Sequence, residues 1–509
     1  MGNFAPLRAQ LNTAALSLYF AAMFYLISTY WPHILFVVSL AMGAAAAIHA
    51  AMTKEEVRAA IGWVGVIILS PIVGAVLYAI AGINRIRRAS LSLRRDALIP
   101  EADLDELESF DADTDIVISE FGRRFAALQT LGDRVARNPL ATGNTIDILE
   151  TGDDCYAAMK TAIDGAERSV LLETYIFDRD AIGLRIADCL IAAVKRGVEV
   201  RVLIDAVGAR YSVPSILGYL AEGGVTVSVF NGNVIVGLRL PYANLRTHRK
   251  ILIVDGRIAL TGGMNIRAGF TREMAGENFA RDTHFSVTGP VVADLFNVAA
   301  EDWRFTTGEI LQGGKWRTAM PERQPGDPVF MRVVASGPDR SIETNHKMLM
   351  GAFSIARKSI RIMSPYFLPD RELISALATA ARRGVEVDIV VPAVNNLVLV
   401  DHAMTAQFDQ ILSNYCRIWR SAGAFSHSKL LSIDGVWSYV GSSNLDPRSL
   451  RLNFEIDLEV LNEGFASEID EHIDEVIKSA SPVTLEGLRA RPFPVRLLEK
   501  VLWLGSPYL

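Results

Sequence analysis

Two histidines in this chain are each followed by a lysine two residues later and by an aspartate five residues after the lysine. The first set is His248, Lys250 and Asp255, and the second is His427, Lys429 and Asp434. Only eight histidines occur in 509 residues, so two matches to one template are not expected by chance. A neutral imidazole can attack phosphorus and form a phosphohistidine, while a second imidazole can protonate the leaving group. The pair therefore predicts a phosphoryl transfer that needs no metal ion or cofactor.

Other polar residues recur around both motifs. The two lysines can hold the non-bridging phosphate oxygens. Asn265 and Asn444 each follow a glycine by three residues, and they either bind the same oxygens or brace the loop. Asp282 and Glu455 lie downstream of the two motifs, where a carboxylate can orient an imidazole or form an ordinary ion pair. These four residues are the candidates for orienting the histidines or binding substrate.

The first motif is predicted to lie on a strand over residues 247–254, followed by a turn and a second strand over residues 258–261. Alternate residues of a strand point to one side, so His248 and Lys250 are expected to emerge together. Asp255 stands at odd spacing from Lys250. The two motif aspartates, although grouped with the catalytic residues, are therefore expected mainly to fix the turn.

The segments around the two motifs repeat in the same order. Lys195-Arg196-Gly197-Val198-Glu199-Val200 corresponds to Arg382-Arg383-Gly384-Val385-Glu386-Val387. Strand-like residues 170–177, helix-like residues 183–194 and strand-like residues 200–204 alternate as in βαβ units. We therefore expect an α/β fold made of two duplicated α/β/α sandwich halves, residues 143–330 and 331–482, that share one active site.

The N-terminal part of the chain has the composition of a membrane segment. No Asp, Glu, Lys or Arg occurs from Leu11 to Met52 or from Ala59 to Asn84. About 20 apolar residues cross a bilayer core, which predicts spans over residues 34–52 and 60–82 within a membrane segment of residues 1–98. Residues 14–30 form either a third span or an interfacial helix. A cleaved signal peptide is disfavoured because the apolar run is too long.

Charged residues beyond the second span indicate topology and partners. The cations after it favour the cytoplasmic side: they are Arg85, Arg87, Arg88, Arg94 and Arg95. An acidic stretch over residues 101–115 predicts a solvated linker, or a first helix that faces water, within a lead-in of residues 99–142. Residues 483–509 are expected to form an amphipathic tail. The net charge of −6 gives no basic footprint for nucleic acid. Three widely spaced cysteines provide neither a disulfide framework nor a cysteine-based zinc site.

With these residues the chain resembles the phospholipase D superfamily and, within it, the bacterial cardiolipin synthases. The superfamily match rests on the two H-x-K-x-x-x-x-D motifs. The narrower match rests on Glu173-Thr174-Tyr175-Ile176-Phe177, Asn244-Leu245-Arg246 and Asn444-Leu445-Asp446-Pro447-Arg448-Ser449. Gly263 departs from the pattern, because the superfamily often has a serine there, as Ser442 is in the second copy.

The resemblance implies a multi-pass enzyme of the bacterial inner membrane, with its catalytic domain in the cytoplasm. One phosphatidylglycerol would donate its phosphatidyl group to a histidine, and a second would attack to give cardiolipin. Superfamily analogy implies His248 as nucleophile and His427 as acid and base, although the two motifs are symmetric. Phosphatidylglycerol and anionic membrane lipid are the implied partners, and the oligomeric state is left open. The alternatives are a phospholipase D-type hydrolase and a phosphatidyltransferase that uses another alcohol or phosphatidylethanolamine. Two intact motifs disfavour a non-catalytic membrane scaffold.

Overall fold

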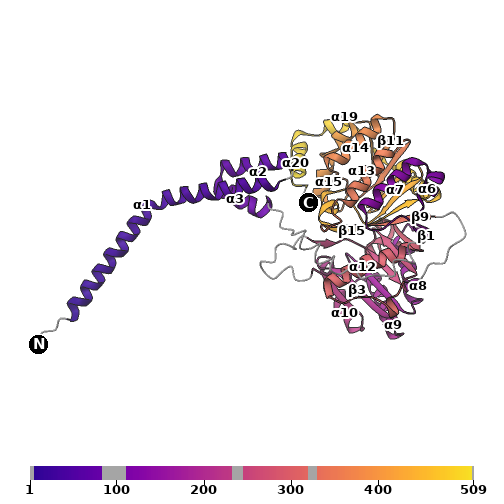
Figure 1. Ribbon diagram of the computed structural model, residues 1–509, viewed down its shortest axis with the longest axis horizontal. Helices are drawn as coiled ribbons and strands as arrows, with labels where there is room; N and C mark the ends of the chain where they lie inside the picture. Colours follow the sequence, from indigo (N-terminus) through magenta and orange to yellow (C-terminus); the bar gives the residue numbers. More distant parts are fainter. Residues whose placement is uncertain (1–4, 55, 83–109, 232–244, 319–328, 507–509) are drawn as a thin grey trace. The chain divides into compact units, whose positions relative to one another are not determined.

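The computed structural model describes residues 5–54, 56–82, 110–231, 245–318 and 329–506. The chain separates into two units, Met1–Arg87 and Arg88–Leu509. Figure 1 shows the first as helices only and the second as a mixture of helices and strands. The basic cluster of residues 85–95 and the acidic residues 101–108 lie outside the described residues.

The N-terminal unit begins with one long helix, α1 (Ala5–Thr53), which contains Pro32. Residues 14–30 and 34–52 were predicted as separate elements, but the helix continues through the proline. A proline removes one helical hydrogen bond and can bend a helix without ending it, and Figure 1 shows α1 bending along its length. Among the described helices, Ser28–Thr53 is the one segment long and apolar enough to cross a membrane, with a mean hydropathy of 2.1.

The predicted second span is divided into shorter helices. α2 (Val57–Leu69) is followed by α3 (Pro71–Leu77) and a π-helical turn, η1 (Tyr78–Gly82). Pro71 has no N–H to continue α2, and it occupies the first turn of α3, where none is needed. α1, α2 and η1 pack together around Ala50, Ile67 and Tyr78. The uninterrupted helix expected over residues 60–82 is therefore not found.

The described strands of the second unit join in one sheet. Their bounds are β1 (Ala141–Leu149), β2 (Ser169–Thr174), β3 (Glu199–Asp205), β4 (Thr226–Phe230), β5 (Arg246–Thr247), β6 (Ile251–Val254), β7 (Ile258–Gly262), β8 (His284–Thr288), β9 (Val329–Ser336), β10 (Ser359–Met363), β11 (Glu386–Pro392), β12 (Arg417–Ser421), β13 (Leu430–Ile433), β14 (Trp437–Gly441), β15 (Asn453–Leu461) and β16 (Ser481–Pro482).

The strand order is β16-β12-β11-β10-β13-β14-β15-β9-β1-β8-β7-β6-β2-β3-β4, with β5 paired to β15. Counted outward from the β9–β1 pair, β9-β15-β14-β13-β10-β11-β12 in the second half corresponds strand by strand to β1-β8-β7-β6-β2-β3-β4 in the first. Each half contains three parallel strands near its outer edge, β2-β3-β4 and β10-β11-β12. This order confirms the mixed α/β fold and agrees with a duplicated chain.

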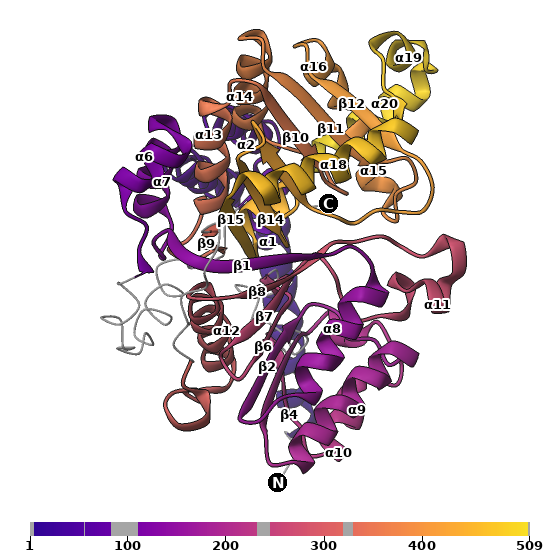
Figure 2. The same cartoon turned by 90° about the vertical axis from the view of Figure 1, so that its right-hand side faces the viewer.

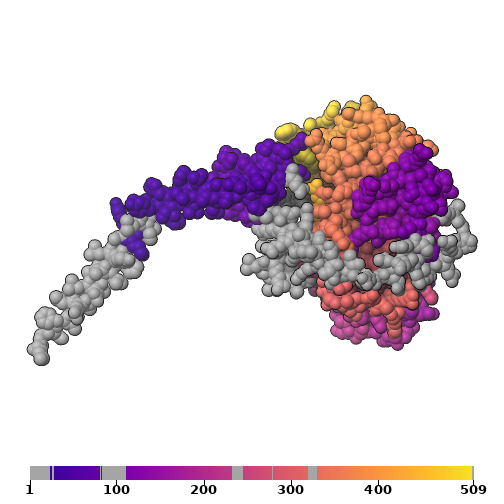
Figure 3. All heavy atoms as spheres, viewed as in Figure 1, coloured from indigo at the N-terminus to yellow at the C-terminus, as the bar shows by residue number. Residues whose placement is uncertain are grey.

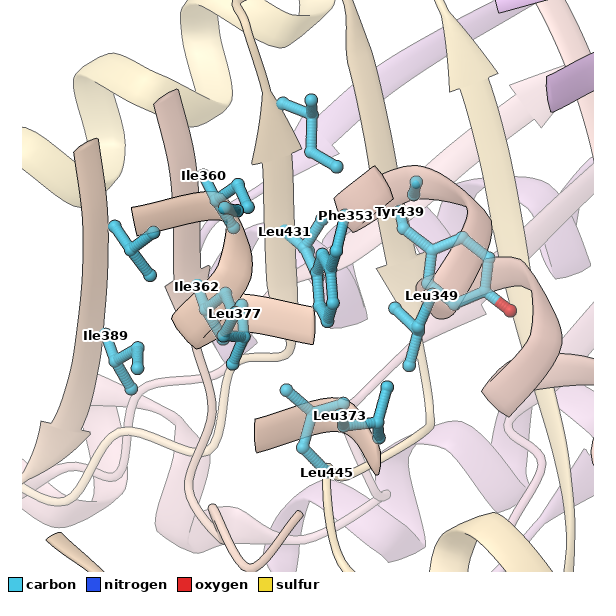
Figure 4. Packing of buried hydrophobic residues seen from close by; sticks show 14 of the residues in the cluster. Leu349, Phe353, Ile360, Ile362, Leu373, Leu377, Ile389, Leu431, Tyr439 and Leu445 are labelled. Atoms are coloured by element: carbon cyan, nitrogen blue, oxygen red, sulfur yellow. The ribbon is translucent and has the colours of Figure 1, made fainter. Parts of the chain in front are cut away.

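Helices pack on the strands of each half. The α-helices that follow β1 in the chain are α8 (Gly152–Asp164), α9 (Ala181–Lys195), α10 (Ile216–Glu222), α11 (Arg272–Ala275), α12 (Val291–Thr307), α13 (Thr344–Ile355), α14 (Arg371–Arg382), α15 (Val398–Thr405), α16 (Phe408–Leu412), α17 (Pro447–Arg451), α18 (Glu463–Ser479), α19 (Leu485–Ala490) and α20 (Phe493–Leu504). Figure 2 shows β2, β6, β7 and β8 between α12 and the pair α8 and α9. In the second half, α18 packs along the strands from β10 to β15. Figure 4 shows the core of that half, where Phe353 packs among Ile360, Ile362, Leu377 and Leu431.

The lead-in before the first half belongs to the core of the second half. α6 (Thr114–Phe121) and α7 (Arg123–Val135) contribute to this core, and α7 buries Phe125 and Leu128 in the same cluster as Phe353. Figure 3 shows this purple segment against the orange second half. Asp113, expected in a solvated linker, caps α6 by accepting a hydrogen bond from the Asp115 N–H at 2.8 Å. The side chains of Asp111, Asp113 and Asp115 are exposed, whereas Val117 and Phe125, which follow them in the chain, join the core.

Candidate active site

The first motif lies between a short strand that pairs with the second half and a strand that pairs within the first half. The strand predicted over residues 247–254 is interrupted: β5 pairs with β15 of the second half, whereas β6 pairs with β2 of the first. The His248 N–H donates to the Phe454 carbonyl at 2.8 Å, and the His427 N–H donates to the Arg281 carbonyl at 2.7 Å. Strand alternation therefore does not apply across His248 and Lys250, although both side chains are buried.

Each histidine is hydrogen-bonded to a carboxylate of the opposite half. His248 Nδ1 lies 2.9 Å from Glu455 Oε2, and His427 Nδ1 lies 2.7 Å from Asp282 Oδ2. Both carboxylates are fully buried. An Nδ1–H donated to a carboxylate leaves Nε2 with the lone pair that attacks or accepts a proton. The structure thus brings together the four residues that the sequence placed in two separate motifs and two downstream positions.

The two carboxylates are held in different ways. Glu455 also accepts hydrogen bonds from the Ser442 hydroxyl at 2.6 Å and from Asn453 Nδ2 at 3.2 Å. Asp282 accepts instead from the Thr283 N–H at 2.8 Å. A Cβ added at Gly263 would lie less than 3.0 Å from Asp282 Oδ1. Glycine at this position therefore leaves room for Asp282, while serine at the equivalent position binds Glu455.

The two lysines are buried beside the histidines. Lys250 Nζ donates to the His248 carbonyl at 2.6 Å, and Lys429 Nζ donates to the His427 carbonyl and lies 2.7 Å from His427 Nδ1. Burial lowers the pKa of Lys250 to about 7 against the opposing pull of Glu455, and the charge of Lys429 lowers it further. Burial likewise lowers the pKa of Lys429 to about 8, against the pull of Asp282. The two ammonium groups are thus poorly solvated, and a phosphate group beside them would stabilise their charged forms.

The imidazoles are neutral and their carboxylates ionised at neutral pH. Burial, together with Lys429, lowers the pKa of His427 to about 4 although Asp282 opposes the shift. Burial also lowers the pKa of His248, against the pull of Glu455. Burial tends to raise the pKa of Asp282 and Glu455, but the nearby lysines and histidines outweigh it and lower both values. Neutral imidazole is the protonation state that a nucleophile requires.

The motif aspartates bind backbone amides. Asp255 accepts hydrogen bonds from the N–H groups of Glu167, Arg168 and Ser169 at 2.7–2.9 Å. Asp434 accepts from the equivalent amides of Arg357, Lys358 and Ser359, and it also forms an ion pair with Arg124. These bonds hold the segments that lead into β2 and β10, and not the turns at Asp255-Gly256 and Asp434-Gly435 that the spacing predicted.

The two predicted asparagines are also buried, but their amides have different contacts. Asn265 Oδ1 accepts from the Ile176 N–H at 3.1 Å, so it braces the loop after β2. Asn444 Nδ2 donates to the Ser449 hydroxyl at 3.4 Å, and its buried Oδ1 has no hydrogen-bond partner among the described residues. For Asn265, the contact favours the bracing role over phosphate binding.

Two tyrosines border the histidines and were not predicted as site residues. The Tyr175 ring lies 5.1 Å from the His248 ring, and the Tyr366 ring lies 5.9 Å from the His427 ring. They follow β2 and β10, at the carboxyl edge of the parallel strands where α/β sheets bind ligands. Both tyrosines follow the first parallel strand of their half, and this equivalence in the repeat is the signal from which they could have been predicted.

One further cluster of ligand-type residues occurs in the described part of the chain. His346 Nε2 lies 2.9 Å from Asp370 Oδ2 and 3.6 Å from Glu372 Oε2. The hydrogen bond to Asp370 raises the pKa of His346. Asp370 also caps α14 by accepting from the Glu372 and Leu373 amides. The geometry is therefore that of an ion pair at a helix start.

Known proteins resemble this chain over most of its length. Residues 159–286 and 349–477 match the family model described as "Cardiolipin synthase, PLD-like domain", and residues 41–82 match a phospholipase D-nuclease N-terminal model. The chain is 31% identical to a cardiolipin synthase of Alkalihalophilus pseudofirmus over 88% of each chain. It is 32% identical to cardiolipin synthase A of Yersinia pseudotuberculosis, over 90% of this chain and 94% of the relative.

A solved structure shares the fold. The phosphatidylserine synthase of Haemophilus influenzae superposes with a TM-score of 0.56 at 16% identity, over 75% of this chain and 100% of that one. At this identity the likeness concerns the fold alone. The two matched repeats and the relatives that span nearly the whole chain show that it belongs to the cardiolipin synthase family of phospholipase D-like proteins.

Proposed function

We propose that this chain is a cardiolipin synthase, a phosphatidyltransferase that converts two molecules of phosphatidylglycerol into cardiolipin and glycerol. Family membership supports the activity. The observation that carries the mechanism is the pair of neutral imidazoles, His248 and His427, each held at Nδ1 by a buried carboxylate. Two such groups beside two buried lysines suit a double displacement at phosphorus.

In the first displacement, His248 Nε2 attacks the phosphorus of phosphatidylglycerol. The new P–N bond forms as the bond between phosphorus and the glycerol oxygen breaks, and His427 gives that oxygen its proton. In the protein without substrate His427 is neutral, with a pKa of about 4. The negative phosphodiester favours the protonated imidazole when it binds, so the acid form arises with the substrate.

In the second displacement, a hydroxyl of another phosphatidylglycerol replaces His248. His427, now neutral, takes the hydroxyl proton while the oxygen attacks phosphorus and the P–N bond breaks. Lys250 and Lys429 stabilise the charge on the non-bridging oxygens in both steps. Ser442 and Asn453 hold Glu455 so that His248 keeps its orientation throughout.

The apolar N-terminal helix and the cations that follow residue 84 support a location at the membrane. We propose that Ser28–Thr53 crosses the bilayer and that residues 57–82 return as a broken helix, which places the catalytic unit in the cytoplasm of a bacterial cell. The cations after residue 84 favour that side. We also propose that residues 143–330 and 331–482 are the two halves, each an α/β/α sandwich.

The activity is tested with purified full-length protein and phosphatidylglycerol as the sole lipid, followed by mass spectrometry of the products. Cardiolipin and glycerol in equal amounts are expected. Phosphatidic acid without cardiolipin would show a hydrolase instead. Added phosphatidylethanolamine or other alcohols test the remaining alternative. Faster cardiolipin formation with release of ethanolamine, or a phosphatidyl product of the added alcohol that exceeds cardiolipin, would support it.

A further inference from the structure

Large apolar side chains are exposed on two equivalent loops of the catalytic unit. The loop after β3, residues 206–215, exposes 54% of Tyr211 and 94% of Val213. The segment after β11, residues 393–399, comprises a loop and the first two residues of α15, and it exposes 66% of Val394 and 63% of Val398. We call these two segments the rim loops. Apolar side chains grouped in this way mark a binding surface on proteins that otherwise bury them.

The rim loops adjoin the candidate active site. The Tyr366 hydroxyl, whose ring faces His427, donates to Asn396 Oδ1 at 2.8 Å. Asn395 Nδ2 donates to the Pro365 carbonyl at 3.0 Å, which ties the same rim loop to the segment before Tyr366. Two hydrogen bonds thus connect the second rim loop to the wall of the site.

The first rim loop reaches the site from the other half. The Ser212 hydroxyl accepts from the Arg179 N–H at 2.8 Å, close after Tyr175 in the chain. Burial raises the pKa of the Tyr175 hydroxyl, and the nearby Tyr211 hydroxyl raises it further. Burial is also the main cause that raises the pKa of Tyr366, and Tyr211 adds a smaller increase there. Tyr211 therefore lies near both tyrosines that border the histidines.

Cations flank the first rim loop. Arg210 precedes Tyr211 and is exposed, as is Arg179. The Arg267 guanidinium lies 5.8 Å from the centre of the Tyr211 ring while it pairs with Asp178 at 2.9 Å. Apolar side chains with cations beside them are the composition of surfaces that enter the headgroup region of anionic bilayers.

We propose that the two rim loops dock on an anionic lipid bilayer and insert their apolar side chains at the level of the headgroups. The phosphodiester of a lipid could then reach the histidines while its acyl chains stay in the bilayer. This inference rests on the proposed function, because it names how that substrate arrives. The loops are equivalent in the duplicated fold, so each half contributes one contact.

Insertion is measured directly in full-length protein reconstituted in phosphatidylglycerol vesicles. A nitrobenzoxadiazole label is placed at Val398→Cys, since the three native cysteines are buried. Its control is Tyr415→Cys, which is 78% exposed but precedes β12 and so lies at the opposite edge of the sheet from the rim loops. Doxyl groups on the lipid acyl chains should quench the label at residue 398 at least threefold more than the label at residue 415. Equal quenching by aqueous iodide at both positions would overturn the proposal.

The functional arm compares vesicles with detergent micelles that contain short-chain phosphatidylglycerol. For the Val394→Asp/Val398→Asp variant, the ratio of vesicle rate to micelle rate should fall at least tenfold, and Tyr415→Asp should keep the wild-type ratio. An unchanged ratio, or a disulfide that joins two copies of the unlabelled Val398→Cys variant, would overturn docking on lipid. If the wild type makes no cardiolipin but the label at residue 398 is quenched, the proposed activity fails and the docking stands.

Discussion

His248 takes its hydrogen-bond partner from the other half of the protein, with Nδ1 2.9 Å from Oε2 of Glu455 on β15. His427 mirrors this arrangement with Asp282, which immediately precedes Thr283 and β8 of the first half. Neither half therefore contains both a motif histidine and the carboxylate that is hydrogen-bonded to it. The duplication produces one pair of oriented histidines only when the two halves are docked.

The first prediction concerns the roles of the two histidines. With His248→Ala, no covalent phosphatidyl–protein adduct should form, because the attacking nitrogen is missing. With His427→Ala, the adduct should form from an activated donor that needs no leaving-group proton, and it should persist because no base activates the acceptor. Acid-labile, base-stable label on the denatured protein measures the adduct. An adduct retained in His248→Ala and lost in His427→Ala would reverse the assignment.

The second prediction concerns the exchanged carboxylates. Glu455→Gln and Asp282→Asn should each slow turnover about 100-fold or more, because an amide can hold the imidazole in the wrong tautomer. Rapid-quench measurements should show that Glu455→Gln slows formation of the adduct, whereas Asp282→Asn slows proton transfer at His427 and thus breakdown of the adduct. If both variants slowed the same step equally, the carboxylates would not serve separate histidines.

Local pattern sufficed to predict the histidines, lysines and carboxylates of the candidate site, but not their partners or the two bordering tyrosines. His248 and Lys250 were evident from spacing, and Asp282 and Glu455 from their similar positions downstream. Which carboxylate serves which histidine depends on how the halves dock, and no spacing within one half contains that information. For the same reason the strand through His248 was predicted as continuous, although it changes partners from β15 to β2 at the motif.

The fold was predicted well where the apolar periodicity was clear, as in α9 and β3. The prediction failed where single residues or tertiary contacts outweigh the preference that the local composition indicates. Pro71 divides the second apolar segment, whereas Pro32 leaves α1 continuous. The docking of the lead-in was not predicted either: Asp113 and Asp115 are exposed, but Phe125 further along joins the core of the second half.

The third prediction concerns stability. Burial acts to raise the pKa of Asp434, but Arg124 and three backbone amides outweigh it and lower the value. The ionised carboxylate therefore stabilises the fold above the unfolded-state pKa of about 3.9, and this contribution is lost as the pH falls through the lower folded-state pKa. Asp434→Asn should cost about 3–5 kcal/mol at pH 7, and the difference from wild type should shrink below about pH 4. Thermal unfolding across this pH range measures it.

Asp164→Asn is the matched control for Asp434→Asn, because the Lys160–Asp164 pair is exposed on α8. Such a pair contributes little, so the control should unfold at nearly the wild-type temperature. A loss of stability in Asp434→Asn no larger than that in the control would contradict the structural role of the motif aspartate.

The fourth prediction concerns the buried lysines. Their pKa values of about 7 for Lys250 and about 8 for Lys429 leave both largely deprotonated at pH 8.5 without ligand. A bound phosphodiester favours the ammonium forms, so at this pH the lysines should take up as many as about two protons on binding, besides the proton taken up by His427. At pH 6 both lysines are already protonated and the uptake by them should vanish.

Calorimetric titration with a soluble phosphodiester, glycerophosphoglycerol, in buffers of different ionisation enthalpy counts these protons. Lys250→Met should remove about one of them at pH 8.5. The same deprotonation should lower kcat/KM as the pH rises above about 7, the pKa of Lys250. Binding at pH 8.5 without proton uptake would show that the lysines do not face the phosphate.

The fifth prediction concerns the space beside Asp282. Gly263→Ala would place a Cβ less than 3.0 Å from Asp282 Oδ1, so the carboxylate must move away from His427. Activity should therefore fall about as far as in Asp282→Asn, with breakdown of the adduct affected most. Gly269→Ala is the control, since no atom lies within 4 Å of an added Cβ there. Ser442→Ala, which removes one hydrogen bond from Glu455, should lose only about fivefold, corresponding to about 1 kcal/mol. Wild-type rates in Gly263→Ala would show that His427 does not need Asp282 at its present position, because the added methyl group cannot be accommodated without displacing that carboxylate.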